Sequence, residues 1–428
     1  MASQTMSPEL EEKIKEKLLE GVTQRVGMAG RELTDDETEQ IIIDEVIDLT
    51  ENLPITEQDR KYLAASFAND FLKLGPLEPL LADDNVTEIM VNGGGRDEET
   101  GEKLPPKTFV EVNGLLQAVQ GDLFENDAQL YRVIGQIGRK IGRSCTSAHP
   151  IMDARLEDGS RVLAVHGDVA PDGPCLVIRK FRRDVMTPDI LIESGSCPRH
   201  VMAFLQSCVE SRVNIFVSGG TGSGKTTLLN VLSIFIPPSE RIITIENPIE
   251  LQLDQPNLER WEARPANTEG EGEVTIHNLL VAALRARPDR IVVGEVRSIE
   301  TIDMLQAMTT GHDGSLSTIH ANDPITAFSR LRTMVQESNP NMNIDAIDSM
   351  VASAIELIVQ VERDGNGHRH ISEIVAVEGY QDGTIVHNDL FKFNPVTRCL
   401  EGQQVQSKRI KDRIEHAQKP YNPQWFMM

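Results

Sequence analysis

A glycine-rich stretch in the middle of the chain has the residue types and spacing of a phosphate-binding loop. Within NIFVSGGTGSGKTTLL, the pattern G-x-x-x-x-G-K-T begins at Gly219 and ends at Thr226. Glycines let consecutive backbone amides turn towards a phosphate group, and the following helix adds its N-terminal amides. In this pattern Lys225 reaches the β- and γ-phosphates and the Thr226 hydroxyl coordinates Mg²⁺. The stretch therefore predicts a site for ATP and Mg²⁺ made by Gly219, Gly220, Thr221, Gly222, Ser223, Gly224, Lys225, Thr226 and Thr227.

Three glutamates follow short apolar runs and could supply the acidic groups of such a site. Glu295 ends RIVVGE, whereas Glu246 and Glu250 follow RIITI. If these runs are parallel strands, their carboxyl ends lie at the edge of the sheet that binds ligands. There Glu295 would help to hold Mg²⁺, and a carboxylate from the second segment would orient the attacking water. The alternative is a core strand followed by a capping or surface glutamate.

Two histidines flank another apolar run. In GHDGSLSTIHAND, His312 precedes the run and His320 ends it. A histidine near the γ-phosphate could sense whether that group is present and couple hydrolysis to movement. The spacing is not that of a zinc site, so the alternative is a packed or surface histidine.

The segments that must position these residues alternate in type. From NIFVSG to ITAFSRLRTMV, short β-type runs alternate with helical ones, which predicts a mainly parallel sheet with helices on both faces. Upstream, TEIMVNG, TFVEVNG, SRVLAVHG and CLVIRKF are typical of strands, and QLYRVIGQIGRKIG of a helix. GGGRDEETGEKLPP is polar and rich in Gly and Pro, which favours a surface loop. Residues 7 to about 75 are predicted to be helical, with Thr34 and Glu37 forming a capping box.

Bulk composition narrows the function classes. The 428 residues carry a formal net charge of −24, which argues against general binding to nucleic acid or anionic lipid. The five cysteines form no CxxC pair, as expected for a reduced cytosolic protein without a zinc cluster. The charged start is not a signal peptide, and no apolar run is long enough to span a membrane. We therefore expect a cytoplasmic protein that meets a membrane only through partners.

The order of the motifs resembles the secretion ATPase superfamily, which powers type II secretion, type IV pili and type IV secretion. The motifs are GGTGSGKTT, TIENPIELQL, RPDRIVVGEVR and TGHDGSLSTIHAND. Within that superfamily, GPLEPLLADDNVTEIMVNG, MDARLEDGSRV, LVIRKF and ARPANTEGEGEVTI are most similar to the CpaF-like motors of Tad (Flp) pili. The similarity runs from about Leu74 to about Gln360.

The resemblance implies a fold and a division of the chain. It implies an α/β protein with an N-terminal helical segment over 1–73, a smaller PAS-like α/β domain over 74–183 and a RecA-like P-loop ATPase domain over 184–428. Each nucleotide would sit between the two α/β domains.

It also implies roles for individual residues. Glu295 would support Mg²⁺ through its water shell, and Glu250 would be the catalytic glutamate, with Glu246 close by. His312 and His320 would form the histidine box. Arginines of the N-terminal α/β domain would close over the phosphates, and they map to Arg155, Arg161, Arg179 and Arg182.

The chain departs from the family pattern in a few places. Asn247 stands where relatives often have Asp, which puts any role of that second acid in doubt. The four-cysteine zinc insertion of many type II relatives is absent. The GGGRDEETGEKLPPKTF segment is longer than the usual hairpin there, and we assign it no role.

The function implied is that of a hexameric ATPase motor for assembly or retraction of a Tad-type pilus. It would act at the inner membrane through platform proteins and bind no nucleic acid directly. The nearest alternative is a type IV secretion ATPase that moves effectors or DNA. A nucleic-acid translocase and a non-hydrolysing, nucleotide-gated scaffold are the alternatives from other classes.

Overall fold

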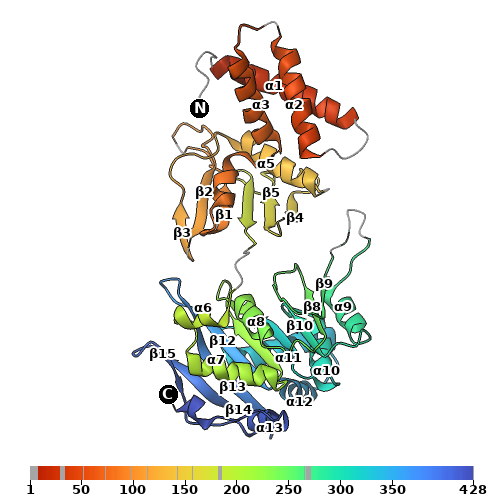
Figure 1. Cartoon of the computed structure of the whole chain (residues 1–428), viewed down its shortest axis with the longest axis vertical. Coiled ribbons are helices and arrows are strands. Elements are labelled where there is room, and N and C mark those ends of the chain that lie inside the picture. Colours follow the sequence, from red (N-terminus) through yellow and green to blue (C-terminus); the bar gives the residue numbers. More distant parts are fainter. Residues whose placement is uncertain are drawn as a thin grey trace. The chain divides into compact units, whose positions relative to one another are not determined.

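The computed structural model describes residues 8–28, 34–51, 53–72, 74–97, 99–112, 114–141, 143–156, 158–181, 186–264, 266 and 271–427. The chain divides into two compact units, Met1–Arg182 and Arg183–Met428 (Figure 1). In the described part, every helix is too short or too polar to cross a lipid bilayer.

The first unit begins with three helices, α1 (Pro8–Met28), α2 (Asp35–Thr50) and α3 (Glu57–Leu72). The predicted capping box is confirmed, because Thr34 Oγ1 accepts a hydrogen bond from Glu37 N and Glu37 Oε2 accepts one from Thr34 N. The helices enclose a small apolar core of their own, which includes Ile14, Leu18, Val22, Ile42, Val46, Leu63 and Phe67.

The rest of this unit contains an antiparallel sheet and helix α5 (Asp127–Lys140), whose buried side chains form one apolar core. The strands run in the order β3-β2-β1-β6-β5-β4. Their bounds, with those of two short helices, are η1 (Gly75–Leu77), α4 (Glu78–Ala82), β1 (Val86–Asn92), β2 (Lys107–Val112), β3 (Leu115–Ala118), β4 (Ile151–Arg155), β5 (Arg161–Val165) and β6 (Cys175–Arg179). The predicted strands β1, β2, β5 and β6 and the predicted helix α5 are confirmed, whereas β3 and β4 were not predicted. The expected surface loop contains an antiparallel bridge between Arg96 and Lys103.

The second unit is built on a nine-stranded sheet in the order β15-β14-β13-β12-β7-β11-β10-β8-β9. Pairing is parallel from β12 to β9, as predicted, and antiparallel from β12 to β15. The strands are β7 (Ile215–Gly219), β8 (Ile242–Glu246), β9 (Leu258–Glu262), β10 (Arg290–Val293), β11 (Leu316–His320), β12 (Leu357–Arg363), β13 (Arg369–Gln381), β14 (Thr384–Asn394) and β15 (Cys399–Gly402). The helices are α6 (Pro188–Glu193), α7 (Arg199–Glu210), α8 (Lys225–Ile234), α9 (Ile276–Ala283), α10 (Glu300–Thr309), α11 (Pro324–Ser338), α12 (Ile344–Ala354), α13 (Lys408–His416) and η2 (Pro423–Phe426).

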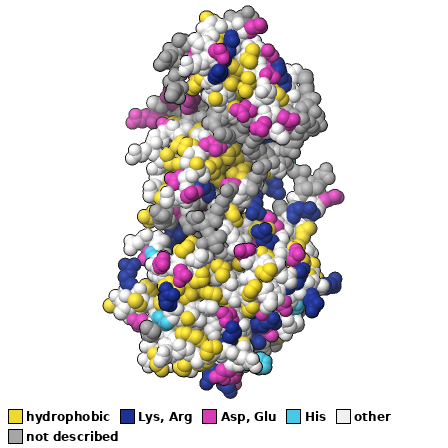
Figure 2. Space-filling model, viewed as in Figure 1, with side chains coloured by type: hydrophobic (Ala, Val, Ile, Leu, Met, Phe, Trp, Pro, Cys, Tyr) yellow, Lys and Arg dark blue, Asp and Glu magenta, His cyan; other side chains and the backbone are white. Residues whose placement is uncertain are grey.

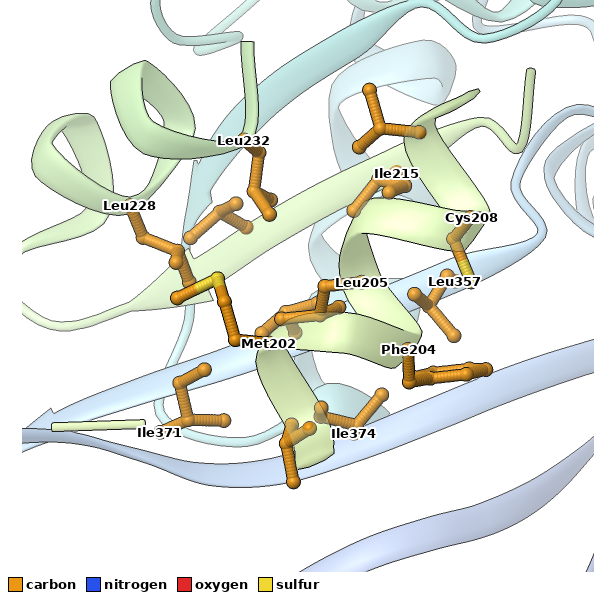
Figure 3. Packing of buried hydrophobic residues seen from close by; sticks show 14 of the residues in the cluster. Met202, Phe204, Leu205, Cys208, Ile215, Leu228, Leu232, Leu357, Ile371 and Ile374 are labelled. Atoms are coloured by element: carbon orange, nitrogen blue, oxygen red, sulfur yellow. The ribbon is translucent and has the colours of Figure 1, made fainter. Parts of the chain in front are cut away.

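Helices cover both faces of this sheet, so both faces of the central strands are buried and these strands are apolar throughout. Successive residues of β7 point to opposite sides, so Ile215 and Val217 join one core and Phe216 joins the other. Helices α7 and α8 cover the first core, as Figure 3 shows for Met202 and Leu228. Helices α9 to α12 contribute to the second core. The carboxyl ends of the parallel strands are therefore held rigidly at one edge.

At the opposite edge a buried asparagine joins the central strands. Asn214, which directly precedes β7, donates through Nδ2 to the carbonyls of Met308 and Ala354. Its Oδ1 accepts hydrogen bonds from the backbone N–H groups of Gly314 and Ser315. The amide group thus uses two donors and two acceptor positions to tie helices α10 and α12 to the start of β11.

Candidate active site

The phosphate-loop residues connect β7 to α8 and adopt a conformation that requires glycine. Gly222 and Gly224 have φ of 68° and 96°, in the left-handed region that favours glycine. At Gly219 an added Cβ would lie 2.5 Å from both Ser223 Oγ and the Val361 carbonyl oxygen. The loop leads directly into α8, which starts at Lys225. This is the strand, glycine-rich turn and helix N-terminus that phosphate binding uses.

Three of the predicted side chains meet at this loop. Lys225 is buried and its Nζ donates to the Gly220 carbonyl oxygen at 2.8 Å. The same Nζ lies 3.3 Å from Nε2 and 3.4 Å from Nδ1 of His320. His320 Nε2 in turn lies 3.1 Å from Glu295 Oε1. The register explains the contact, because His320 is paired with Gly219 and both residues end their strands.

Glu295 is held between two basic groups. Its Oε2 accepts a hydrogen bond of 2.7 Å from Arg297 Nη2, and its Oε1 faces His320. Oε1 is buried, and no donor among the described residues is aligned on it for a hydrogen bond. A buried carboxylate oxygen with spare acceptor capacity beside a phosphate loop is suited to Mg²⁺ or to a water in its shell.

The residues beside the loop can be compared with the ligands that Mg²⁺ takes at a phosphate site. Within the described ranges, no three His, Cys, Asp or Glu side chains form a group that could hold a metal ion. Mg²⁺ at a phosphate site typically uses one or two protein oxygens, with phosphates and water completing the octahedron. Thr226, in the first turn of α8, and Glu295 fit that pattern.

The predicted acidic pair lies at the end of the neighbouring strand β8. Glu246 is buried, and its Oε2 accepts hydrogen bonds from the backbone N–H groups of Glu250 at 2.8 Å and Leu251 at 2.9 Å. Burial raises the pKa of Glu246 to about 7; those two hydrogen bonds lower it, and the charges of Glu250 and Glu262 raise it further. Glu246 therefore fixes the turn that carries Glu250. A pKa of about 7 also lies in the range that suits a general acid or base at neutral pH.

Of the two histidines, His320 alone lies beside the phosphate loop of its own unit. Burial lowers its pKa, Glu295 opposes that change, and Lys225 adds to it. A neutral imidazole is therefore favoured. His312 lies before β11, at the opposite edge of the sheet, where its backbone N–H donates to the Ala307 carbonyl oxygen. A role of His312 at the nucleotide stays a prediction, and this placement gives it no contact with the loop of the same unit.

The predicted arginines of the first unit form a row. Arg155 is paired with Arg161 and Arg161 with Arg179, across β4, β5 and β6. Residues directly opposite one another point to the same face of a sheet, so the three side chains share one face. Arg179 Nε lies 3.5 Å from Glu88 Oε1 on β1. The remaining arginine, Arg182, lies outside the described residues.

The fold and the site agree with the comparison to known families. Residues 102–396 match the family described as Type II/IV secretion system protein. The chain belongs to this family. Two relatives are similar over most of their lengths: the conjugal transfer protein TrbB of Rhizobium radiobacter is 31% identical over 71% of this chain and 87% of its own. The protein VirB11 of Agrobacterium fabrum is 40% identical over 63% of this chain and 86% of its own.

A solved structure agrees at the level of the fold. The ATPase DotB of Yersinia pseudotuberculosis matches with a TM-score of 0.50 and 17% identity, over 71% of this chain and 78% of its own. An N-terminal α/β domain followed by a RecA-like P-loop domain is thus the architecture of this type II/IV secretion system protein.

Two residues of this secretion protein reach the site without having been singled out from the sequence. Arg297 pairs with Glu295, and its place two residues beyond the glutamate in GEVR was a usable signal. Arg369 Nε donates to the Gly222 carbonyl oxygen, with a distance of 2.8 Å between the two atoms. Arg369 begins strand β13, which lies beyond the sequence motifs. A turn signal, Asp364-Gly365-Asn366-Gly367, precedes it and predicts the hairpin but not its neighbour.

Proposed function

We propose that the chain is a Mg²⁺-dependent ATPase that acts as a motor of a secretion or pilus machine. The observation that carries this proposal is the meeting of Lys225, His320 and Glu295 at one phosphate loop. A structural glycine turn gives no reason for a buried lysine, a histidine and a glutamate from three separate segments to converge on it. The membership in the type II/IV secretion family supports the same chemistry.

Each group would have a distinct role in hydrolysis. The amides of residues 219–224 would bind phosphate oxygens, and Lys225 would move from the Gly220 carbonyl to the β- and γ-phosphates. Thr226 and Glu295 would hold Mg²⁺, which supplies charge neutralisation of the phosphates. Glu250 would orient the attacking water, on a turn fixed by Glu246.

The arginine row would serve the same reaction from the other unit. Arg155, Arg161 and Arg179 present guanidinium groups on one face, and such groups make two-point contacts with phosphate. Closing over the nucleotide would neutralise charge that develops in the transition state. Contacts of this kind would link nucleotide binding and release to movement of the protein, which a motor needs.

The test is phosphate release by the purified full-length protein. We expect turnover of ATP that requires Mg²⁺ and stops when EDTA removes the ion. Lys225→Ala should weaken ATP binding at least roughly tenfold, since the phosphates lose their counter-charge. A parent protein that binds ATP with Mg²⁺ present yet releases no phosphate would overturn the ATPase and favour the nucleotide-gated scaffold.

The machine that the motor serves has two candidates, each with its own support. The relatives named conjugal transfer protein TrbB and VirB11 favour type IV secretion. The motifs most similar to CpaF-like motors favour a Tad pilus. We propose type IV secretion as the first assignment, ahead of the Tad pilus that the motifs favour, because the relatives with these names are 31% and 40% identical over 71% and 63% of the chain. Deleting the gene should abolish transfer of DNA or effectors and leave pili intact; loss of pili with normal transfer would reverse the order.

The assembly is proposed as a homo-hexamer in the cytoplasm that meets inner-membrane platform proteins. A direct nucleic-acid translocase is less favoured, because the net charge is −24 and basic and acidic side chains are interspersed on the face shown in Figure 2. Light scattering with and without ATP tests the hexamer. Stimulation of ATP turnover by DNA would restore the translocase.

A further inference from the structure

The hairpin formed by β12 and β13 borders the phosphate loop. Strand β12 runs parallel to β7, with Val361 paired with Gly219, so it continues past the point where the loop begins. Its last residue, Arg363, is paired directly with Arg369, the first residue of β13. The two arginines thus lie at the end of the hairpin that faces the loop.

Both arginines contact the loop at its glycines. Arg369 Nε donates to the Gly222 carbonyl oxygen at 2.8 Å. Its Cδ lies 3.4 Å from where a Cβ on Gly224 would be, and Arg363 Nη1 lies 3.4 Å from where a Cβ on Gly222 would be. Gly222 and Gly224 are the two loop residues with positive φ. The hairpin therefore packs against the part of the loop whose backbone is least able to hold its own shape.

The hairpin is itself fixed on its other sides. Asp364 Oδ1 accepts from the backbone N–H groups of Asn366 and His368, which closes the turn. His368 Nε2 lies 3.0 Å from the Ser194 carbonyl oxygen, just after α6, and Ile371 N donates to the Ser196 carbonyl oxygen. Arg369 therefore extends from a braced support rather than from a free strand end.

The hydrogen bond has a consequence for the loop amides. In a planar trans peptide the C=O and the following N–H point in opposite directions. Fixing the Gly222 carbonyl on the side of Arg369 aims the N–H of Ser223 away from the hairpin. If this peptide flipped, a carbonyl oxygen would replace that donor, and a phosphate would meet a negative dipole instead of a positive one.

We propose that Arg369 is a positioning residue that holds the Gly222–Ser223 peptide in the orientation that binds phosphate. The proposal rests on the proposed nucleotide function of the loop. Arg369 acts before the ligand arrives, by keeping the competent loop populated. Apparent affinity falls in proportion to the fraction of protein in the competent state, whereas the reaction of the bound complex does not.

The test compares isosteric variants of Arg369. The amide nitrogen of Gln and the Nε of Arg stand four atoms from Cα, so Arg369→Gln keeps a donor at the same place without the charge. Arg369→Met keeps the length and removes the donor. The control is Arg398→Met, because Arg398 pairs with Asp364 on the same hairpin rather than with the loop.

The first measurement is the binding of ADP and of inorganic pyrophosphate, and the second is kcat and KM for ATP. The third is hydrogen exchange of the amides of residues 219–224 in nucleotide-free protein. Arg369→Met should weaken both ligands roughly tenfold, equivalent to about 1.4 kcal/mol. Its kcat at saturating ATP should stay within about threefold of the parent, and its loop amides should exchange faster. Arg369→Gln should recover most of the affinity, and Arg398→Met should match the parent.

Other outcomes overturn the inference. A fall in kcat without a change in affinity makes Arg369 a group that acts in the reaction itself. Equal losses for the Gln and Met variants show that the charge, not the donated hydrogen bond, matters. If the parent binds ADP and Arg369→Met binds it equally well, the positioning role of Arg369 is refuted and the nucleotide function of the loop stands. If the parent binds no ADP, the proposed nucleotide function itself is refuted.

Discussion

Replacing Glu246 with Gln should change how the stability of the second unit depends on pH. Burial raises the pKa of this carboxyl group to about 7, from an ordinary value of 4.5. As pH rises between these values, the unfolded chain loses its proton while the folded protein keeps it, so the free energy of unfolding falls across this window. Each pKa unit corresponds to about 1.4 kcal/mol, and the full effect is therefore about 3 kcal/mol.

Glutamine keeps an oxygen that can accept the N–H groups of Glu250 and Leu251 but cannot ionise. The amide NH₂ group of the glutamine replaces Oε1, which has no hydrogen-bond partner in the described structure. Because an amide does not titrate, the free-energy cost of burying this group is the same at every pH. The melting temperature of Glu246→Gln relative to the parent should consequently rise by roughly 5–10 °C between about pH 5 and pH 8. Titrating groups that do not interact with Glu246 cancel in this difference.

The assay is thermal melting of parent and variant in parallel at half-unit steps of pH. Unfolding is monitored by fluorescence or calorimetry. Glu262→Gln is a suitable control, because Glu262 is one of the charges that raise the pKa of Glu246. It should shift the transition in the parent to lower pH and have no such effect when combined with Glu246→Gln. A difference between parent and variant that stays constant across the same pH range would refute the raised pKa, and with it the view that Glu246 titrates near neutrality.

Three further predictions concern the reaction and the N-terminal helices. Glu250→Gln should keep ATP binding but slow hydrolysis about 10²-fold in single-turnover assays. Turnover at the parent rate would make Glu246 the candidate for this role. Ala in place of Arg155, Arg161 or Arg179 should lower kcat with the melting temperature and oligomeric size retained; parent rates in all three variants would leave these arginines as surface charges. A truncation starting at Leu74 should stay soluble and bind ATP, because the three helices enclose a separate core, and should lose its coupling in cells; insoluble protein would show that the helices complete the domain.

Local patterns in the sequence were sufficient for the strands that carry the site. The run before Glu295 and the run before Glu246 are apolar without alternation, as buried parallel strands require. Both glutamates consequently lie at the carboxyl ends of neighbouring strands, as expected. The capping box at Thr34 was equally predictable, because it depends on residues only three positions apart.

Contacts between distant segments could not be read in this way. Gly222 and Arg369 are 147 positions apart, and only the pairing of β12 with β7 brings them together. The alignment of Arg155, Arg161 and Arg179 depends on strand register, which the pattern of alternation leaves open to shifts of whole two-residue steps. His312 and His320 were grouped by the family resemblance, on either side of an apolar run. That run is strand β11, which begins four residues after His312 and ends at His320, so at about 3.3 Å per residue the two histidines lie towards opposite edges of the sheet.

Asn214 has a consequence for the evolution of the family. Its buried side chain fills two donor and two acceptor positions, and among the other side chains only Gln offers the same groups, with one methylene too many. Substitution at this position should therefore be strongly selected against in homologues that keep these helices and strands. Such invariance would reflect folding rather than catalysis, because the residue stands a full strand away from the phosphate loop. Invariance of a polar residue at the amino ends of these parallel strands is thus not by itself evidence for a catalytic role.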